Sequence, residues 1–276
     1  MPAQTPQPAS PYDDEAIEEV PLASAPLVRV LAQVRHPALL VLSNEEEGTE
    51  AAMRVGSRIA KQFPIFESGH ESSVLITQEG IKEKKADSSW IWRLRSGDDA
   101  WQVTFTRNFV ALETSRYRGR TDFLERLSQV LTAYGKEIDP PSVSRVGFRY
   151  TNRISDTSHI DMLPELVRPE LLGPAGAPLP ENATLTHAFG QSQFVTDWGG
   201  SLLNWGLLPP NGVFDPTITP TANKSWILDL DLFNSQRRPF DASSLVLTAN
   251  NLAGRAYTHF RWAVTSKFLE VFGEAE

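Results

Sequence analysis

Three consecutive β-strands followed by an amphipathic helix are the strongest structural signal in this sequence. Between residues 90 and 117, aromatic and β-branched residues alternate with polar ones in three segments, separated by Ser-Gly-Asp-Asp and Arg-Asn turns. This pattern predicts an antiparallel meander with one buried face. After Gly119, apolar residues at three- and four-residue spacing predict a helix over 121–135. These segments indicate a mixed α and β fold.

The rest of the chain shows the same two periodicities. Alternation predicts further strands at 26–35, 74–82, 143–154, 187–196, 201–208 and 225–233. Helical spacing predicts helices at 49–62 and 241–272, with a short helix around Met162–Leu171. Strands thus precede a helix twice along the chain.

The order of these elements divides the chain into four parts. Residues 1–24 form an acidic, Pro-rich leader that we expect to be disordered; the alternative is a leader that folds back onto a basic segment or a partner. A first α+β half spans 25–155, a Pro-rich connector spans 156–182, and a second α+β half spans 183–276. The predicted fold is therefore α+β with two similar halves, each an antiparallel sheet followed by a long helix, as a duplication would produce. The alternative is one continuous antiparallel sheet with helices on one face.

Several classes of function are excluded by what the sequence lacks. It contains no cysteine, which removes thiol nucleophiles, disulfides and cysteine zinc sites. Neither GxxxxGK[ST] nor GxGxxG occurs, and the five histidines show no metal-binding spacing. No segment has the apolar run of a signal peptide or a membrane helix. We therefore expect a cytoplasmic, non-enzymatic protein that needs no cofactor and has no membrane association.

Charge is unevenly distributed along the chain. The net charge is −8, yet residues 1–50 carry two basic and nine acidic residues, whereas residues 82–153 carry fourteen basic and nine acidic ones. An acidic protein repels nucleic-acid backbones at long range, so any anion would have to bind this local basic segment.

The candidate binding residues lie in that segment. Arg145, Arg149 and Arg153 are four residues apart, so they share one face of a predicted strand. A row of guanidinium groups can bind a phosphate or the carboxylates of a partner. Arg116 and Arg118 add to the same local charge. The alternative is a sheet face whose arginines are neutralised by acidic side chains on neighbouring strands.

A pair of carboxylates is the candidate metal site. Asp229 and Asp231 are two residues apart in a strand, so both project from the same face. Paired carboxylates can hold Mg²⁺ or Mn²⁺. They can equally be the partners of the arginine row, because no further acidic or histidine cluster accompanies them.

Four segments together resemble a known family. They are the opening strand Ala25–Val28, Tyr117 shortly before Phe123, the run Arg145–Ile154, and Leu228–Leu232. The chain resembles a sporadically distributed bacterial family of uncharacterised proteins of similar length. The resemblance implies no activity, cofactor or catalytic residue. A patchy distribution implies horizontally transferred cargo, such as a defence or toxin–antitoxin component.

Two functions follow as expectations. The first is a binding or assembly protein that acts through a protein partner and associates into a homo-oligomer. The alternative is a component of a defence system that binds nucleic acid or processes phosphoryl groups with a metal. In that case Arg145, Arg149 and Arg153 would contact phosphate, and Asp229 and Asp231 would hold the metal.

Overall fold

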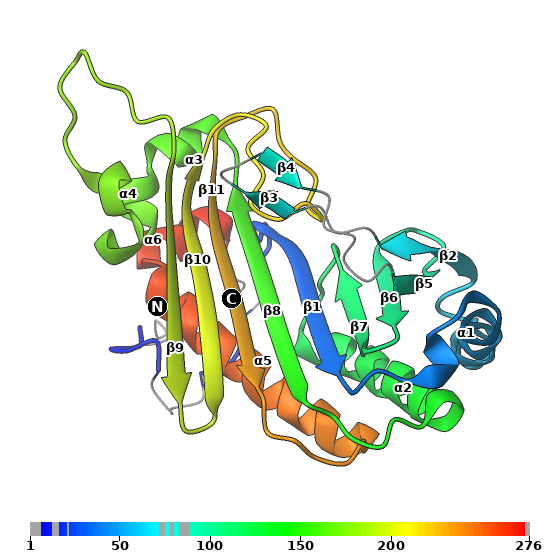
Figure 1. Ribbon diagram of the computed structural model, residues 1–276. Helices are drawn as coiled ribbons and strands as arrows, with labels where there is room; N and C mark the ends of the chain where they lie inside the picture. Colours follow the sequence, from blue (N-terminus) through cyan, green and yellow to red (C-terminus); the bar gives the residue numbers. More distant parts are fainter. Residues whose placement is uncertain are drawn as a thin grey trace.

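One antiparallel sheet organises the molecule. The computed structural model describes residues 7–12, 17–20, 22–71, 75–77, 80–82 and 89–273. Within them, nine strands form a sheet in the order β2-β5-β6-β7-β1-β8-β11-β10-β9 (Figure 1). The strands are β1 (Leu27–Arg35), β2 (Ile65–Glu71), β5 (Ser89–Arg95), β6 (Trp101–Thr106), β7 (Phe109–Thr114), β8 (Arg145–Ile154), β9 (Ala188–Thr196), β10 (Gly199–Leu208) and β11 (Ser225–Asn234). A separate ribbon pairs β3 (Leu75–Thr77) with β4 (Gly80–Lys82).

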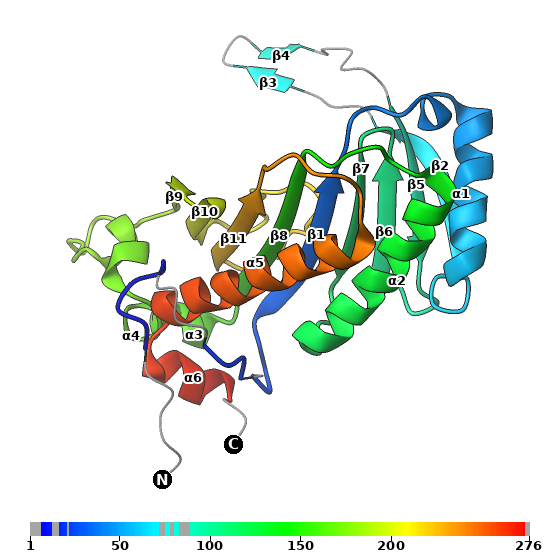
Figure 2. The same cartoon turned by 90° about the horizontal axis from the view of Figure 1, so that it is seen from below.

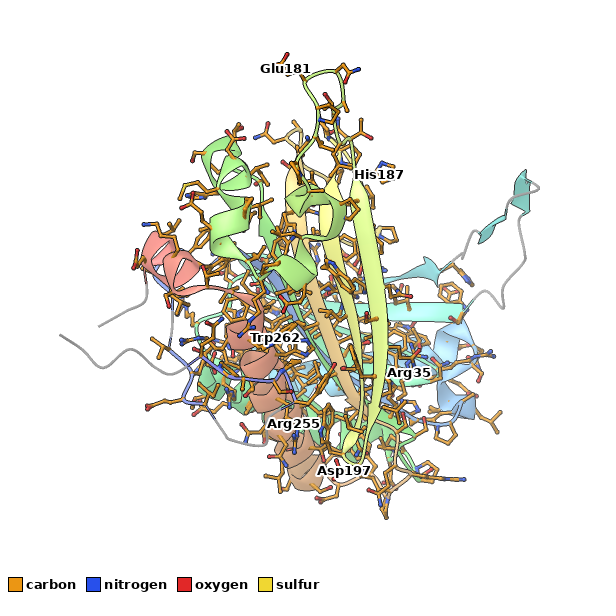
Figure 3. The ribbon with its side chains drawn as sticks, turned by 90° about the vertical axis from the view of Figure 1, so that its left-hand side faces the viewer. Arg35, Glu181, His187, Asp197, Arg255 and Trp262 are labelled. Carbon is orange, nitrogen blue, oxygen red and sulfur yellow. The ribbon has the colours of Figure 1, made fainter. Side chains whose placement is uncertain are left out.

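The long helices cover one face of this sheet. They are α1 (Glu45–Ile59), α2 (Arg120–Ile138) and α5 (Ala242–Ala263) (Figure 2). The shorter helices are α3 (Thr157–Asp161), α4 (Leu163–Leu166) and α6 (Ser266–Phe272), with single 3₁₀ turns η1 (Leu40–Leu42), η2 (Pro169–Leu171) and η3 (Gly173–Gly176). In Figure 3 the sheet is seen from its β9 edge, with Arg255 and Trp262 of α5 on one side and Arg35 on the other. Within the described residues, no helix covers that second face, which we call the uncovered face.

Alternation along each strand explains the two faces. In β8, Val146, Phe148 and Tyr150 are buried toward the helices, whereas Arg145 and Arg149 project from the uncovered face. Buried apolar residues of β1, β8 and β11 belong to the same core as those of α2 and α5. The sheet therefore has one buried apolar face and one polar face, as period-two patterns require.

The two predicted halves share this sheet and do not form separate sheets. β1 pairs with β7 and with β8, and all three strands lie in the predicted first half, 25–155. β8 in turn pairs with β11 of the second half. The continuous sheet with helices on one face, which the sequence left as the alternative, is therefore the observed architecture. The joining strands are buried on the helix side, so separating the halves would expose the core.

Several elements differ from their predicted bounds for local reasons. α1 begins at Glu45, because the Asn44 side chain accepts a hydrogen bond from the Glu47 amide and caps the helix there. The predicted helix over 241–272 is two helices, since Val264 is extended and forms an isolated bridge with Val167. The strand predicted at 74–82 lies partly outside the described residues. Its described residues form two short strands, β3 and β4.

Candidate functional site

The arginine row and the aspartate pair face each other across two neighbouring strands. β8 pairs with β11 so that Arg149 lies opposite Asp231 and Thr151 lies opposite Asp229. All four side chains project from the uncovered face, because their neighbours in each strand fill the core. The two groups that the sequence offered as separate candidates are therefore one arrangement.

Asp229 is the most deeply buried charge of this arrangement. Its side chain is 0% exposed, and its two oxygens accept hydrogen bonds from Arg149 Nε at 2.7 Å and Nη2 at 3.0 Å. Thr151 Oγ1 donates at 2.8 Å and Asn204 Nδ2 at 3.0 Å. Four donors thus hold one carboxylate, which is how a buried charge is stabilised in a protein interior.

Asp231 forms a second and more accessible ion pair. Arg145 Nη2 donates to Asp231 Oδ2 at 2.8 Å, and the Arg145 guanidinium lies 4.4 Å from the centre of the Phe233 ring. Burial raises the pKa of Asp231 against the opposing influence of Arg145. Arg35 lies directly opposite Arg145 in the β1–β8 register. Burial, with the Arg145 charge adding to it, lowers the pKa of Arg35.

A carboxylate from outside the sheet completes the arrangement. The loop over residues 209–224, between β10 and β11, places Asp215 Oδ2 at 2.8 Å from Arg149 Nη1 and 3.4 Å from Arg29 Nη1. Arg29 Nη1 also donates to Thr217 Oγ1 at 2.6 Å. Burial acts to raise the pKa of Asp215, but hydrogen bonds from Thr217 and the two arginines outweigh it, so the pKa lies below its usual value.

On β1, Arg29 also forms an ion pair with a residue of a neighbouring strand. Arg29 Nε donates to Glu113 Oε2 on β7 at 2.6 Å. We call the whole arrangement the ion-pair ladder. Its members are Arg29, Glu113, Arg145, Arg149, Asp215, Asp229 and Asp231. Six are side chains of the sheet and one comes from the loop.

The other predicted arginines lie apart from the ladder. Arg153 also projects from β8, where its Nη1 donates to the Thr219 carbonyl of the same loop at 2.6 Å. Arg116 Nη1 forms a 3.0 Å ion pair with Asp98, and both side chains are largely exposed. Together with Arg118 it lines a separate cavity of about 500 Å³. The basic residues of the middle segment therefore do not form one continuous patch.

That cavity lies on the helix side of the sheet beneath part of the acidic leader. We call residues 17–20 and 22–25 the strap. Glu19 of the strap accepts hydrogen bonds from Tyr117 Oη and from Arg120 Nε, both at 3.0 Å. Tyr150 Oη lies 3.0 Å from Tyr117 Oη. This part of the leader folds back onto the basic segment, whereas the disorder predicted for 1–24 stays a prediction, with residues 1–6, 13–16 and 21 outside the described ranges.

The aspartate pair binds arginine in this arrangement. Within the described ranges, no three His, Asp or Glu side chains cluster closely enough to hold a metal ion. Both oxygens of Asp229 already accept hydrogen bonds from a guanidinium. The predicted metal site thus lacks a third ligand in the part of the chain that the structure describes.

Two members of the ladder, Arg29 and Asp215, were not predicted from the sequence. Arg29 was visible in an alternating strand, where its odd-numbered position puts it on the polar face. Asp215 carried no signal, because it lies in a Pro-rich loop without periodicity. Only the packing of that loop over β1 and β8 brings it to the arginines.

Comparisons with known proteins leave the resemblance untested. No protein-family model matches the chain, and no curated protein matches it. Among the helices that the structure describes, none combines the length and the apolar character needed to cross a bilayer.

Proposed function

We propose that this chain is a non-enzymatic, cytoplasmic binding protein whose uncovered sheet face docks an acidic segment of a protein partner. One observation carries the proposal: two arginines on the two central strands converge on a single carboxylate, Asp215, that is not part of the sheet. Arg29 and Arg149 are held in place by Glu113 and Asp229 beneath them. A preorganised pair of guanidinium groups recognises a carboxylate with little loss of side-chain freedom.

In this proposal, the Asp215 carboxylate of the loop occupies the position that an acidic side chain of the partner would take. A connection as long as residues 209–224 without regular structure is typical of binding loops and lids. When it moves away, the ladder loses one negative charge, and Arg35 and Arg145 already oppose each other nearby. The exposed face then attracts an acidic side chain in place of Asp215.

We also propose a duplication, with repeats 27–138 and 145–263 that divide the chain before β8, in place of the predicted halves 25–155 and 183–276. Arg29 pairs with Glu113, and Arg149 pairs with Asp229, in the same diagonal geometry. In both cases the carboxylate lies on the neighbouring strand, opposite the residue two positions after the arginine. An experimental structure tests this: superposing 27–138 on 145–263 should place each ion pair on the other, and a superposition that separates them refutes the duplication.

Nothing in the arrangement favours the alternative partner, nucleic acid. Four carboxylates contact Arg29, Arg145 and Arg149, so the ladder carries no net positive charge while Asp215 is in place. A phosphate backbone requires several uncompensated cations in a row. Binding of nucleic acid is therefore a competing outcome of the binding assay.

Fluorescence anisotropy with three labelled probes tests the proposal. The probes are an oligoglutamate peptide, an oligolysine peptide and single-stranded oligothymidylate, each titrated with the full chain at low salt. We expect only oligoglutamate to bind. Arg29→Ala should weaken binding by about tenfold, the value of one charge-assisted hydrogen bond, and Asp215→Asn should strengthen it by freeing the arginines.

The matched control is Arg237→Ala, because Arg237 is exposed and lies outside the ladder. It should bind oligoglutamate as the wild type does. Binding of oligothymidylate in preference to oligoglutamate, or an Asp215→Asn variant that binds no tighter, would overturn the proposal. Light scattering during size-exclusion chromatography tests the homo-oligomer expected from the sequence, and a single mass of one chain at all concentrations would refute that expectation.

A further inference from the structure

The cavity beneath the strap is built like a small-molecule site. It occupies about 500 Å³, within the range of ligand pockets. Its floor is made by the sheet and its walls by α5 and the turn before α2. The strap forms the roof, where Val20, Leu22 and Ala25 line the space. Apolar walls with a few polar groups are what a bound organic molecule requires.

The strap is tied down at separate points around this cavity. The amides of Ala23 and Ser24 donate to the carbonyls of Gly273 and Phe272 at 2.8 and 3.0 Å. The Val20 amide donates to Tyr257 Oη at 2.9 Å. A short segment held at both ends over a cavity keeps the space open instead of collapsing into it.

One polar side chain of β8 faces the cavity. Asn152 is 5% exposed on the helix side of β8 and lines the cavity. A single polar group on the wall of an apolar pocket can fix the orientation of a bound molecule. The amide offers both a donor and an acceptor to a molecule in the cavity.

The charges around the cavity indicate the sign of its ligand. Arg118 and Arg116, which also pairs with the exposed Asp98, lie in its lining, and α2 begins at Arg120. Glu19, the one acidic side chain of the lining, is neutralised by Arg120. The N-terminus of a helix and two guanidinium groups both favour an anion.

We propose that this cavity binds a small amphiphilic carboxylate. Its apolar body lies against Leu22, Leu27 and Phe260, a polar group hydrogen-bonds to Asn152, and the carboxylate meets Arg116 and Arg118. The site lies on the opposite side of the sheet from the ion-pair ladder.

Isothermal titration calorimetry on the full chain tests this with four probes. Laurate and naphthoate carry the carboxylate on an aliphatic and an aromatic body, and dodecyltrimethylammonium and naphthylmethylamine carry a cation on matching bodies. We expect a carboxylate to bind and its cationic counterpart not to bind. The comparison of laurate with naphthoate shows which body the cavity accepts.

Two substitutions separate a ligand group from a structural one. Asn152→Leu keeps the volume and removes the amide; it should weaken carboxylate binding by about tenfold while leaving the melting temperature unchanged or higher. A merely structural Asn152 would lower the melting temperature instead. Ala25→Phe fills the cavity and should abolish binding.

Arg118→Ala keeps the test decisive if the cavity-filling variant fails to fold, because Arg118 is exposed at the surface. It should weaken carboxylate binding, whereas the remote Arg237→Ala should not. Absence of binding by both carboxylates, equal binding of the cations, or unchanged affinity in a folded Ala25→Phe variant would each overturn the proposal.

Discussion

Removing the Asp229 carboxylate tests the central ion pair most directly. In Asp229→Ala, Arg149 loses two hydrogen bonds, and Thr151 and Asn204 lose one each. Thr151 and Asn204 are buried, so bulk water cannot replace the lost acceptor without entering the sheet. Arg149 keeps only its contact with Asp215.

The expected loss of stability follows from this geometry. Breaking a buried ion pair by removing one partner costs about 3–5 kcal/mol, and we expect about 4 kcal/mol here because two further donors are orphaned. A chain of 276 residues has an unfolding entropy of about 580 cal/mol/K, from about 2.1 cal/mol/K per residue. The melting temperature should therefore fall by about 7 °C.

Circular dichroism melting at neutral pH measures this, with Asp231→Ala as the matched control. Asp231 and Arg145 are both partly exposed, so this variant should lose less than about 1 kcal/mol, or about 2 °C. Equal losses in the two variants would refute the reasoning. So would a wild-type melting temperature that rises on adding Mg²⁺ and does not rise in Asp229→Ala, since that result would assign the carboxylate to a metal.

Three further predictions concern other parts of the molecule. Burial lowers the pKa of His259 from 6.5 to about 4. Between these two pH values the unfolded chain binds a proton that the folded chain does not, so the free energy of unfolding, measured by urea titration, should fall by about 3 kcal/mol as the pH drops from 6.5 to 4. His259→Leu should remove this pH dependence. In Gly48→Ala, the new methyl would lie 2.1 Å from Trp92 Cζ2, and urea unfolding should show a loss of about 1–3 kcal/mol. Glu19→Gln should release the strap and speed limited proteolysis of the leader, whereas the exposed neighbour Glu18→Gln should not.

Each of these predictions has a matched control. His187 is exposed, so His187→Leu should keep the wild-type pH slope; a His259→Leu variant that also keeps it contradicts the first prediction. A methyl on Gly97 meets no atom within 4 Å, so Gly97→Ala should change stability by less than about 0.5 kcal/mol. A Gly48→Ala variant as stable as this control contradicts the second, and equal proteolysis of the two glutamine variants contradicts the third.

Elements with a regular local pattern were predictable from the sequence. The meander over 90–117 is observed as β5, β6 and β7, and the helix over 121–135 as α2. β2 was missed, because Ile-Phe-Glu-Ser-Gly-His-Glu has neither clear alternation nor a strong apolar face. The pairing that places it at the sheet edge is made with β5, outside its own sequence.

The sequence by itself determined which side chains share a face, because strand alternation is a local property. It therefore placed Arg145, Arg149 and Arg153 together, and likewise Asp229 with Asp231. Strand order and register depend on contacts between segments far apart in the chain, which no local pattern encodes. Only the tertiary structure decided that the arginine row faces the aspartate pair and that β8 and β11 join the two halves. It also carried Asp215 over the face, where the carboxylate meets both central strands.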